Sequence, residues 1–102
     1  MTAAADAEWF TNHTTGAPVR LREQVQVHFA AALEGSLGER LAAAGGVALL
    51  AATAAGRGRA AALDLLAADA LITLALLATA ERSPAILADV AAALRLQTTV
   101  AG

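Results

Sequence analysis

The stretch over residues 60–80, AAALDLLAADALITLALLATA, is apolar almost all the way round a helix. At about 100° per residue, Leu65, Ile72 and Leu76 fall on one side of it, and Leu71 lies between that side and the opposite one. The opposite side carries Leu63, Leu66, Leu74 and Leu77. A helix at a protein surface has a single apolar stripe, whereas a helix that is apolar on every side has to be enclosed. This segment therefore predicts a helix with packing partners on at least two faces.

The composition makes the enclosure of this helix difficult for one short chain. The sequence has 102 residues, enough for a single domain, and 58% of them are hydrophobic, above the ~45–50% of ordinary globular domains. Most of the excess is alanine, with 31 residues, which favours helix strongly but buries little area per side chain. Helices lined by alanine have to approach closely, and a thin core favours self-association. We expect a homo-oligomer, with a dimer as the favoured state.

Charge and cysteine content exclude several classes of function. The net charge is −2 and no basic patch is present, so we expect no nucleic-acid partner. The absence of cysteine excludes disulfides, thiol catalysis and cysteine-based zinc sites. The first ten residues contain acids, no lysine or arginine and no apolar run, so they do not resemble a secretory signal, and we expect a cytoplasmic protein.

An integral membrane hairpin is a weaker interpretation of the same apolar segments. Residues 41–55 supply about 15 apolar positions, short of the ~20 that a bilayer needs. Residues 60–80 are long enough, but Asp64 and Asp69 each cost roughly 2.5–3.5 kcal/mol near the middle of a membrane. We therefore do not expect insertion, and keep a membrane-associated small protein as a second alternative.

Helix start and stop signals divide the chain into four predicted helices. Pro18 suits a first helical turn, and Gly35 ends the segment that follows it. Ser36 and Glu39 have the spacing of a capping box, and Gly56 has the position of a C-terminal cap. Ser83-Pro84 then begins the last helix. The sequence thus predicts an all-α, compact four-helix up-and-down bundle, with helices at about 18–34, 37–55, 60–81 and 84–96.

The ends of the chain lack helical periodicity. We expect residues 1–16 to form a flexible arm, residues 17–97 a single helical domain and residues 98–102 a frayed tail. Trp9 and Phe10 are two large aromatic side chains within the polar arm. Either they fold back onto the bundle, which is the interpretation we favour, or they anchor a partner protein.

Two adjacent glycines stand in the middle of the second predicted helix. Gly45 and Gly46 each cost about 1 kcal/mol relative to alanine in a helix interior. A helix that retains both is expected to be crossed tightly by another helix there, or to be kinked.

His28 and Asp69 are two polar residues that lie within or beside the apolar faces of the predicted helices. His28 lies on or beside the apolar face of the first helix, and the other ligands that a metal site requires are absent, so we favour a packed structural histidine. Asp69 sits between the leucine faces of residues 60–80, with Thr73 one turn later. It either faces a gap and bonds to Thr73 or to an arginine, fixes the register of a dimer, or acts as a buried catalytic acid, in that order of preference.

The function we expect is that of a non-catalytic helical oligomerisation or adaptor module that acts through protein–protein contacts. We predict no metal, no cofactor and no catalytic residue, and the weak catalytic candidates are Asp69 and His28. The predicted interface residues are Leu63, Leu66, Leu71, Leu74, Leu77, Trp9 and Phe10. The alternative is a small helical-bundle binder or enzyme for an apolar small molecule, with Asp69 and His28 as its polar groups.

Overall fold

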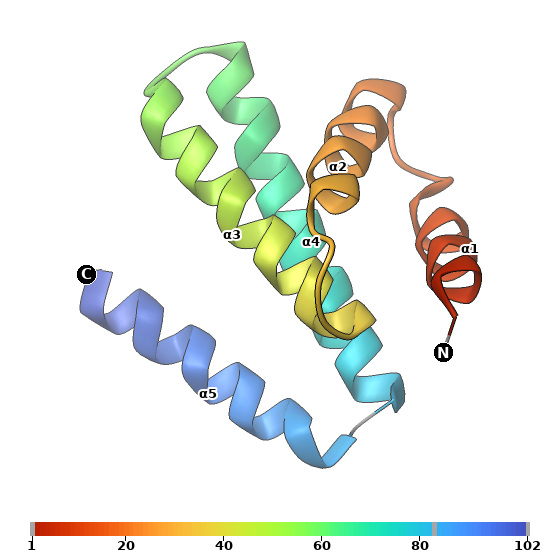
Figure 1. Ribbon diagram of the computed structural model, residues 1–102. Helices are drawn as coiled ribbons and strands as arrows, with labels where there is room; N and C mark the ends of the chain where they lie inside the picture. Colours follow the sequence, from red (N-terminus) through yellow and green to blue (C-terminus); the bar gives the residue numbers. More distant parts are fainter. Residues whose placement is uncertain (1, 83, 102) are drawn as a thin grey trace.

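The described residues of the chain form five α-helices (Figure 1). The computed structural model describes residues 2–82 and 84–101, and the side chains of residues 86, 87, 90 and 97–101 lie outside this description. The helices are α1 (Ala3–Thr14), α2 (Val19–Ala31), α3 (Leu37–Ala55), α4 (Arg59–Arg82) and α5 (Pro84–Ala101). The all-α class predicted from the sequence is confirmed. Its four helices correspond to α2–α5, and α1 is additional.

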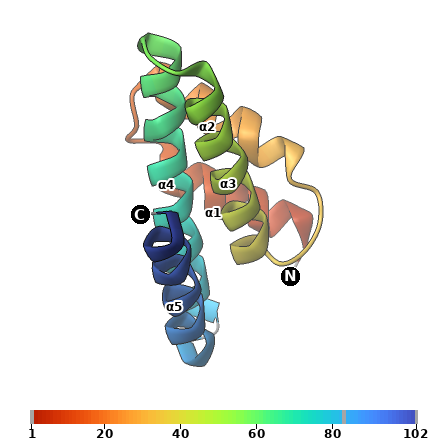
Figure 2. The same cartoon turned by 90° about the vertical axis from the view of Figure 1, so that its left-hand side faces the viewer.

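An antiparallel pair made by α3 and α4 forms the centre of the molecule (Figure 2). The predicted capping box starts α3: the Ser36 hydroxyl accepts from the backbone N–H of Glu39 at 3.3 Å, and the Ser36 N–H donates to Glu39 Oε1 at 3.0 Å. The backbone N–H of Ser36, and to a smaller extent its side chain, lower the pKa of the Glu39 carboxyl. Gly56 ends the helix with φ 75°, a conformation that favours glycine, and the next helix begins at Arg59.

The seam between α3 and α4 is narrow because small residues line it. Leu41 and Leu71 are fully buried there, and alanines fill most of the remaining positions. A Cβ placed on Gly45 would lie 2.9 Å from Ile72 Cγ1, closer than side-chain atoms tolerate, and 3.4 Å from the backbone nitrogen of that residue. Gly45 is therefore a point of close approach between the two helices, as is Gly38, whose added Cβ would lie 2.8 Å from Thr79 Oγ1. The tight crossing predicted from the glycine pair is confirmed at Gly45.

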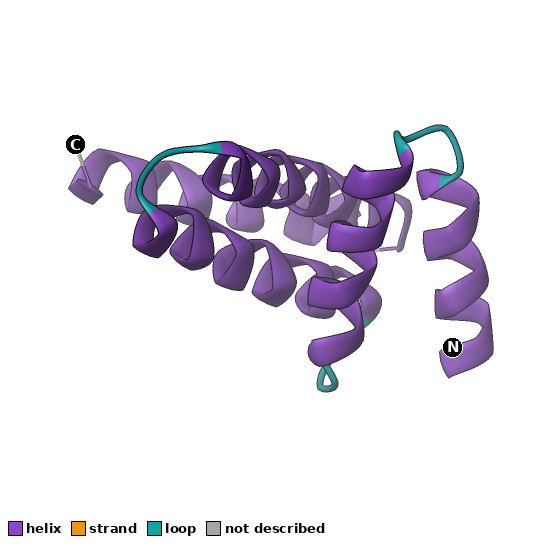
Figure 3. Ribbon diagram, turned by 90° about the horizontal axis from the view of Figure 1, so that it is seen from above, coloured by secondary structure: helices purple, strands orange, loops and turns teal. Residues whose placement is uncertain are grey.

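The α1 and α2 helices run across the direction of the α3–α4 pair rather than along it (Figure 3). For this reason the structure does not confirm a simple up-and-down arrangement. Ala31 ends α2 three residues before the predicted boundary, and the carbonyl of Ala32 accepts from Arg40 Nε at 2.7 Å. The chain then turns to place Leu37 in the core.

A helix replaces the flexible arm expected at residues 1–16. The Thr2 hydroxyl caps it by accepting from the Ala5 N–H, and Phe10 is 2% exposed. The Phe10 ring stacks on Phe29 of α2, with centroids 4.2 Å apart and planes 8° from parallel. Trp9 Nε1 donates to Glu81 Oε2 at 2.8 Å, which ties α1 to the last turn of α4. The aromatic pair thus folds back onto the bundle, as favoured from the sequence.

The last helix leaves the α3–α4 pair after its first turns (Figure 1). It begins at Pro84, as predicted, and the cap expected at Ser83 lies outside the described residues. It continues to Ala101, beyond the predicted end at residue 96, so the segment expected to fray at 98–102 is helical as far as the description extends.

Candidate functional site

The side of α3 that points away from α4 is an apolar surface. Five residues that lie on one side of the helix make up what we call the outer face of α3: Ala43, Gly46, Val47, Leu50 and Ala54. All five are exposed, and Leu50 is 71% exposed and Val47 56%. No charged residue occurs between Arg40 and Arg57, and the hydroxyl of the exposed Thr53 beside this face donates to the backbone carbonyl of Leu49 at 3.0 Å.

The same surface continues toward α4. Leu49 of α3 and Leu65 of α4 are both about half exposed and line one shallow pocket of about 440 Å³ beside the α3–α4 turn. Exposed apolar residues gathered in one region are typical of an interaction surface rather than of a free monomer surface.

The residues predicted to form an interface separate into two groups. Leu66 and Leu77 are exposed, at 55% and 39%, and Leu63 is half-buried. By contrast, Leu71 and Leu74 are buried inside the chain's own core and are not available to a partner.

Trp9 and Phe10 are also not available to a partner protein. Phe10 is in the core, and Trp9 is half-buried, bonded to Glu81 and stacked on His13. The exposed members of the interface prediction therefore come only from α4. The predicted interface did not include the outer face of α3, although the sequence shows that residues 41–56 carry no charge.

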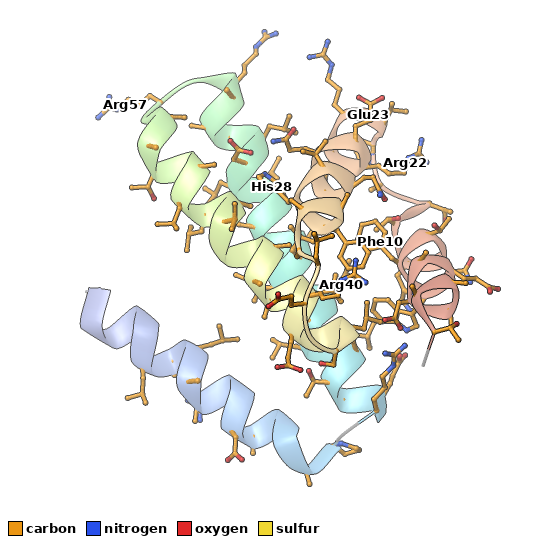
Figure 4. All side chains as sticks on the ribbon, in the orientation of Figure 1. Phe10, Arg22, Glu23, His28, Arg40 and Arg57 are labelled. Atoms are coloured by element: carbon orange, nitrogen blue, oxygen red, sulfur yellow. The ribbon has the colours of Figure 1, made fainter. Side chains whose placement is uncertain are left out.

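His28 is held by hydrogen bonds between α2 and α4 (Figure 4). Its Nε2 lies 3.1 Å from Asp64 Oδ1, and the Gln24 side-chain amide donates to the same oxygen at 2.6 Å. The His28 and Asp64 side chains are 11% and 13% exposed. Hydrogen bonds from His28 and then Gln24 lower the pKa of Asp64. This cluster joins two helices and has the packed, structural geometry favoured for His28 from the sequence.

Asp69 is exposed, and within the described residues its carboxylate bonds neither to Thr73 nor to an arginine, the partners favoured from the sequence. It stands at the edge of a pocket of about 260 Å³ between α1, α2 and α4, whose other lining residues include Arg22 and Thr73. His28 does not line this pocket. The structure therefore separates the two residues that were predicted to serve one binding site.

A metal centre has no support in the described part of the chain. Within residues 2–82 and 84–101, no group of three or more histidine, aspartate or glutamate side chains is placed so as to hold a metal ion. By length and composition alone, both α3 and α4 could cross a membrane. No protein-family model matches the chain, and neither the curated proteins nor the solved structures contain a match.

Proposed function

We propose that this chain is a non-catalytic helical module that associates with a second copy of itself through the outer face of α3, and that the assembly is a dimer. The observation that supports this most directly is the exposure of the outer face itself, above all of Leu50. A helix at the surface of a water-soluble monomer carries polar residues on its outward side. In α3 the outward side between Arg40 and Arg57 carries no charged residue.

Gly46 gives the second argument for a partner on this face. A Cβ added to Gly46 would meet nothing within 4 Å, so packing inside the chain does not require glycine there. Yet glycine costs about 1 kcal/mol relative to alanine in a helix interior. A helix that crosses the outer face closely would use this position in the way that α4 uses Gly45 on the other side.

A second copy fits this surface better than a lipid bilayer does. The uncharged part of α3, residues 41–55, is about 22 Å long as a helix, shorter than the ~30 Å hydrocarbon core of a membrane. In α4, the exposed Asp69 carboxylate interrupts the outward side. The α2 helix, with exposed Arg20 and Glu23, packs against α4, where a bilayer would require apolar residues.

Association through this face would bring together the α3–α4 pairs of two copies. The four central helices would then form a bundle across the interface, the arrangement that the sequence predicts within one chain. A two-fold axis would place each copy's Leu50 near the same region of its partner, so that one substitution acts twice in the dimer. As part of this proposal, we place the assembly in an aqueous compartment, the cytoplasm.

Sedimentation of wild type and two leucine variants over a wide range of protein concentration tests the proposal. Leu50→Arg removes an anchor from both sides of the interface, at roughly 2 kcal/mol each, and should weaken the dimer by about three orders of magnitude. Leu33→Arg is the matched control, because Leu33 is 81% exposed and lies in the α2–α3 loop, away from the outer face. We expect Leu33→Arg to remain dimeric and both variants to keep their helicity.

Three results would overturn self-association through α3. The first is a wild-type chain that sediments as a single copy at every concentration. The second is a Leu50→Arg variant that dimerises as tightly as the Leu33→Arg control. The third is flotation of the wild-type chain with lipid vesicles that is lost in Leu50→Arg, which would assign the same surface to a membrane.

A further inference from the structure

A pocket with apolar walls and a charged rim lies at the junction of α1, α2 and α4. Its volume is about 260 Å³, and it is separate from the outer face of α3, with which it shares no residue. Leu21 and Val25 of α2 and Leu74 of α4 line it, together with the small side chains of Ala17 and Ala70. The walls are therefore suited to a hydrocarbon or aromatic group.

The polar groups on the rim present mainly hydrogen-bond acceptors. Within the described residues, Asp69 has no hydrogen-bond or ion-pair partner, and neither has Thr73 one turn further along α4. His13 also lines the pocket, and its Nδ1 donates to the backbone carbonyl of Trp9 at 2.7 Å. Two acceptors from α4 thus border one apolar space.

Arg22 is the arginine that lines this pocket, and its guanidinium group already has a hydrogen-bond partner. Its Nη1 donates to the carbonyl of Thr15 at 3.3 Å, across the α1–α2 turn. Arg22 also lines a second pocket, whose lining includes the carboxylate-bearing Glu23. Arg22 therefore borders two of the pockets described, whereas Asp69 borders only this one.

We propose that this pocket binds a small protonated amine that carries an apolar group. The ammonium group would donate hydrogen bonds to Asp69 and Thr73, and the apolar group would lie against Leu21, Val25 and Leu74. The size of the pocket sets the size of the ligand, because an apolar cavity of about 150 Å³ holds one benzene molecule. A volume of about 260 Å³ accommodates a benzene-sized ring with a short aminoalkyl chain.

Titration of the full chain with three probes of similar shape tests the charge preference. The probes are 2-phenylethylamine, 3-phenylpropanoate and ethylbenzene, and binding is followed by NMR chemical shifts of the α2 and α4 amides. We expect the amine to bind most tightly and the carboxylate most weakly. Because the Asp69 side chain is exposed, we expect its charge to contribute about fivefold in affinity, and raised salt to reduce this factor.

Two variants and one control connect the binding to the pocket. Asp69→Asn keeps the shape and removes the charge, so it should weaken the amine about fivefold and leave ethylbenzene unchanged. Ala70→Leu fills the space between the walls and should weaken all three probes. Asp89→Asn removes an exposed carboxylate from α5 and should change nothing.

The proposal is wrong if the amine does not bind, or if the carboxylate binds as tightly as the amine. It is also wrong if Asp69→Asn and Asp89→Asn bind the amine equally well. Asp69→Asn alters only an exposed side chain and is expected to fold, so these outcomes do not depend on the behaviour of Ala70→Leu.

Discussion

Replacement of Phe10 by alanine is the most direct test of how α1 is attached to the molecule. The Phe10 ring is 2% exposed and stacks on Phe29 at 4.2 Å, so its truncation leaves a cavity between α1 and α2. Buried Phe→Ala substitutions destabilise proteins by about 3–5 kcal/mol. A domain of this length has a total stability of about 5–15 kcal/mol, so this loss is a large share of the whole.

The structure also supplies a local reporter for this experiment. Trp9 is the single tryptophan of the chain, lies next to Phe10 and donates to Glu81 at 2.8 Å, so its fluorescence follows the docking of α1 on α4. Urea unfolding followed by both tryptophan fluorescence and far-UV circular dichroism distinguishes loss of α1 from global unfolding. For a domain of about 100 residues, a loss of 3–5 kcal/mol corresponds to a fall in Tm of roughly 12–40 °C.

Controls for the Phe10→Ala measurement come from the same two helices. Thr11→Ala changes the next residue, which is exposed, and should alter the free energy of unfolding by no more than about 0.5 kcal/mol. A double-mutant cycle with Phe29→Ala should give a coupling of about 0.5–1.5 kcal/mol for the stacked rings. If Phe10→Ala unfolds like Thr11→Ala, with unchanged fluorescence, then Phe10 is not in the core and residues 1–16 are the flexible arm expected from the sequence.

Two further predictions concern α3 and the α2–α4 cluster. Gly45→Ala should destabilise the fold by up to about 2 kcal/mol, because the new Cβ would meet Ile72. Gly46→Ala should instead add up to about 1 kcal/mol of helix stability, because its Cβ would meet nothing within 4 Å. Urea unfolding at low protein concentration measures both, and a Gly45→Ala variant at least as stable as Gly46→Ala would contradict the observed seam. Since hydrogen bonds lower the pKa of Asp64 in the folded state, its ionised form stabilises the fold above about pH 4, and this contribution is lost as the pH falls through the lowered pKa. Asp64→Asn should therefore be less stable than wild type at neutral pH and lose less stability on acidification; parallel pH profiles of the two proteins contradict this.

The α3 helix could be predicted from the sequence because its ends are set by local chemistry. Ser36 and Glu39 form a capping box that involves only neighbouring residues, and Gly56 adopts the positive φ that its position suggests. The predicted bounds of 37–55 are those of the structure. Signals of this kind do not depend on what the helix packs against, and they are therefore readable in the sequence.

The α1 helix was not predictable from hydrophobic periodicity because its buried face is mostly polar. Asp6, Phe10 and Thr14 are the buried residues of this helix, each four apart. Asp6 bonds to Arg82 at 3.1 Å, and the Thr14 hydroxyl donates to the carbonyl of Phe10 at 2.9 Å. Only one of the three is apolar, so no stripe appears in the sequence, although Thr2 has the residue type of an N-cap.

The exposure of Asp69 has a different cause. The sequence indicates that residues 60–80 are apolar on two sides but does not indicate which side a neighbour will cover. In the structure α3 covers the side of Leu71 and Ile72, α2 covers the side of Leu74, and the arc that contains Asp69 stays open. The partner of His28 is Asp64 for a similar reason, because the path of α2 across α4 decides which carboxylate it meets.

The two proposed sites lie on different parts of the molecule, and this has a thermodynamic consequence. The outer face of α3 points away from α4, whereas the amine pocket is lined by α1, α2 and α4 and by no residue of α3. A ligand at one site changes the affinity of another only if it favours one of two states that both sites share. The seam around Gly45 is closely packed, so we expect the α3–α4 pair to respond to either ligand as one element. Amine binding should therefore leave the dimer dissociation constant unchanged, and Leu50→Arg should bind the amine as the wild-type chain does.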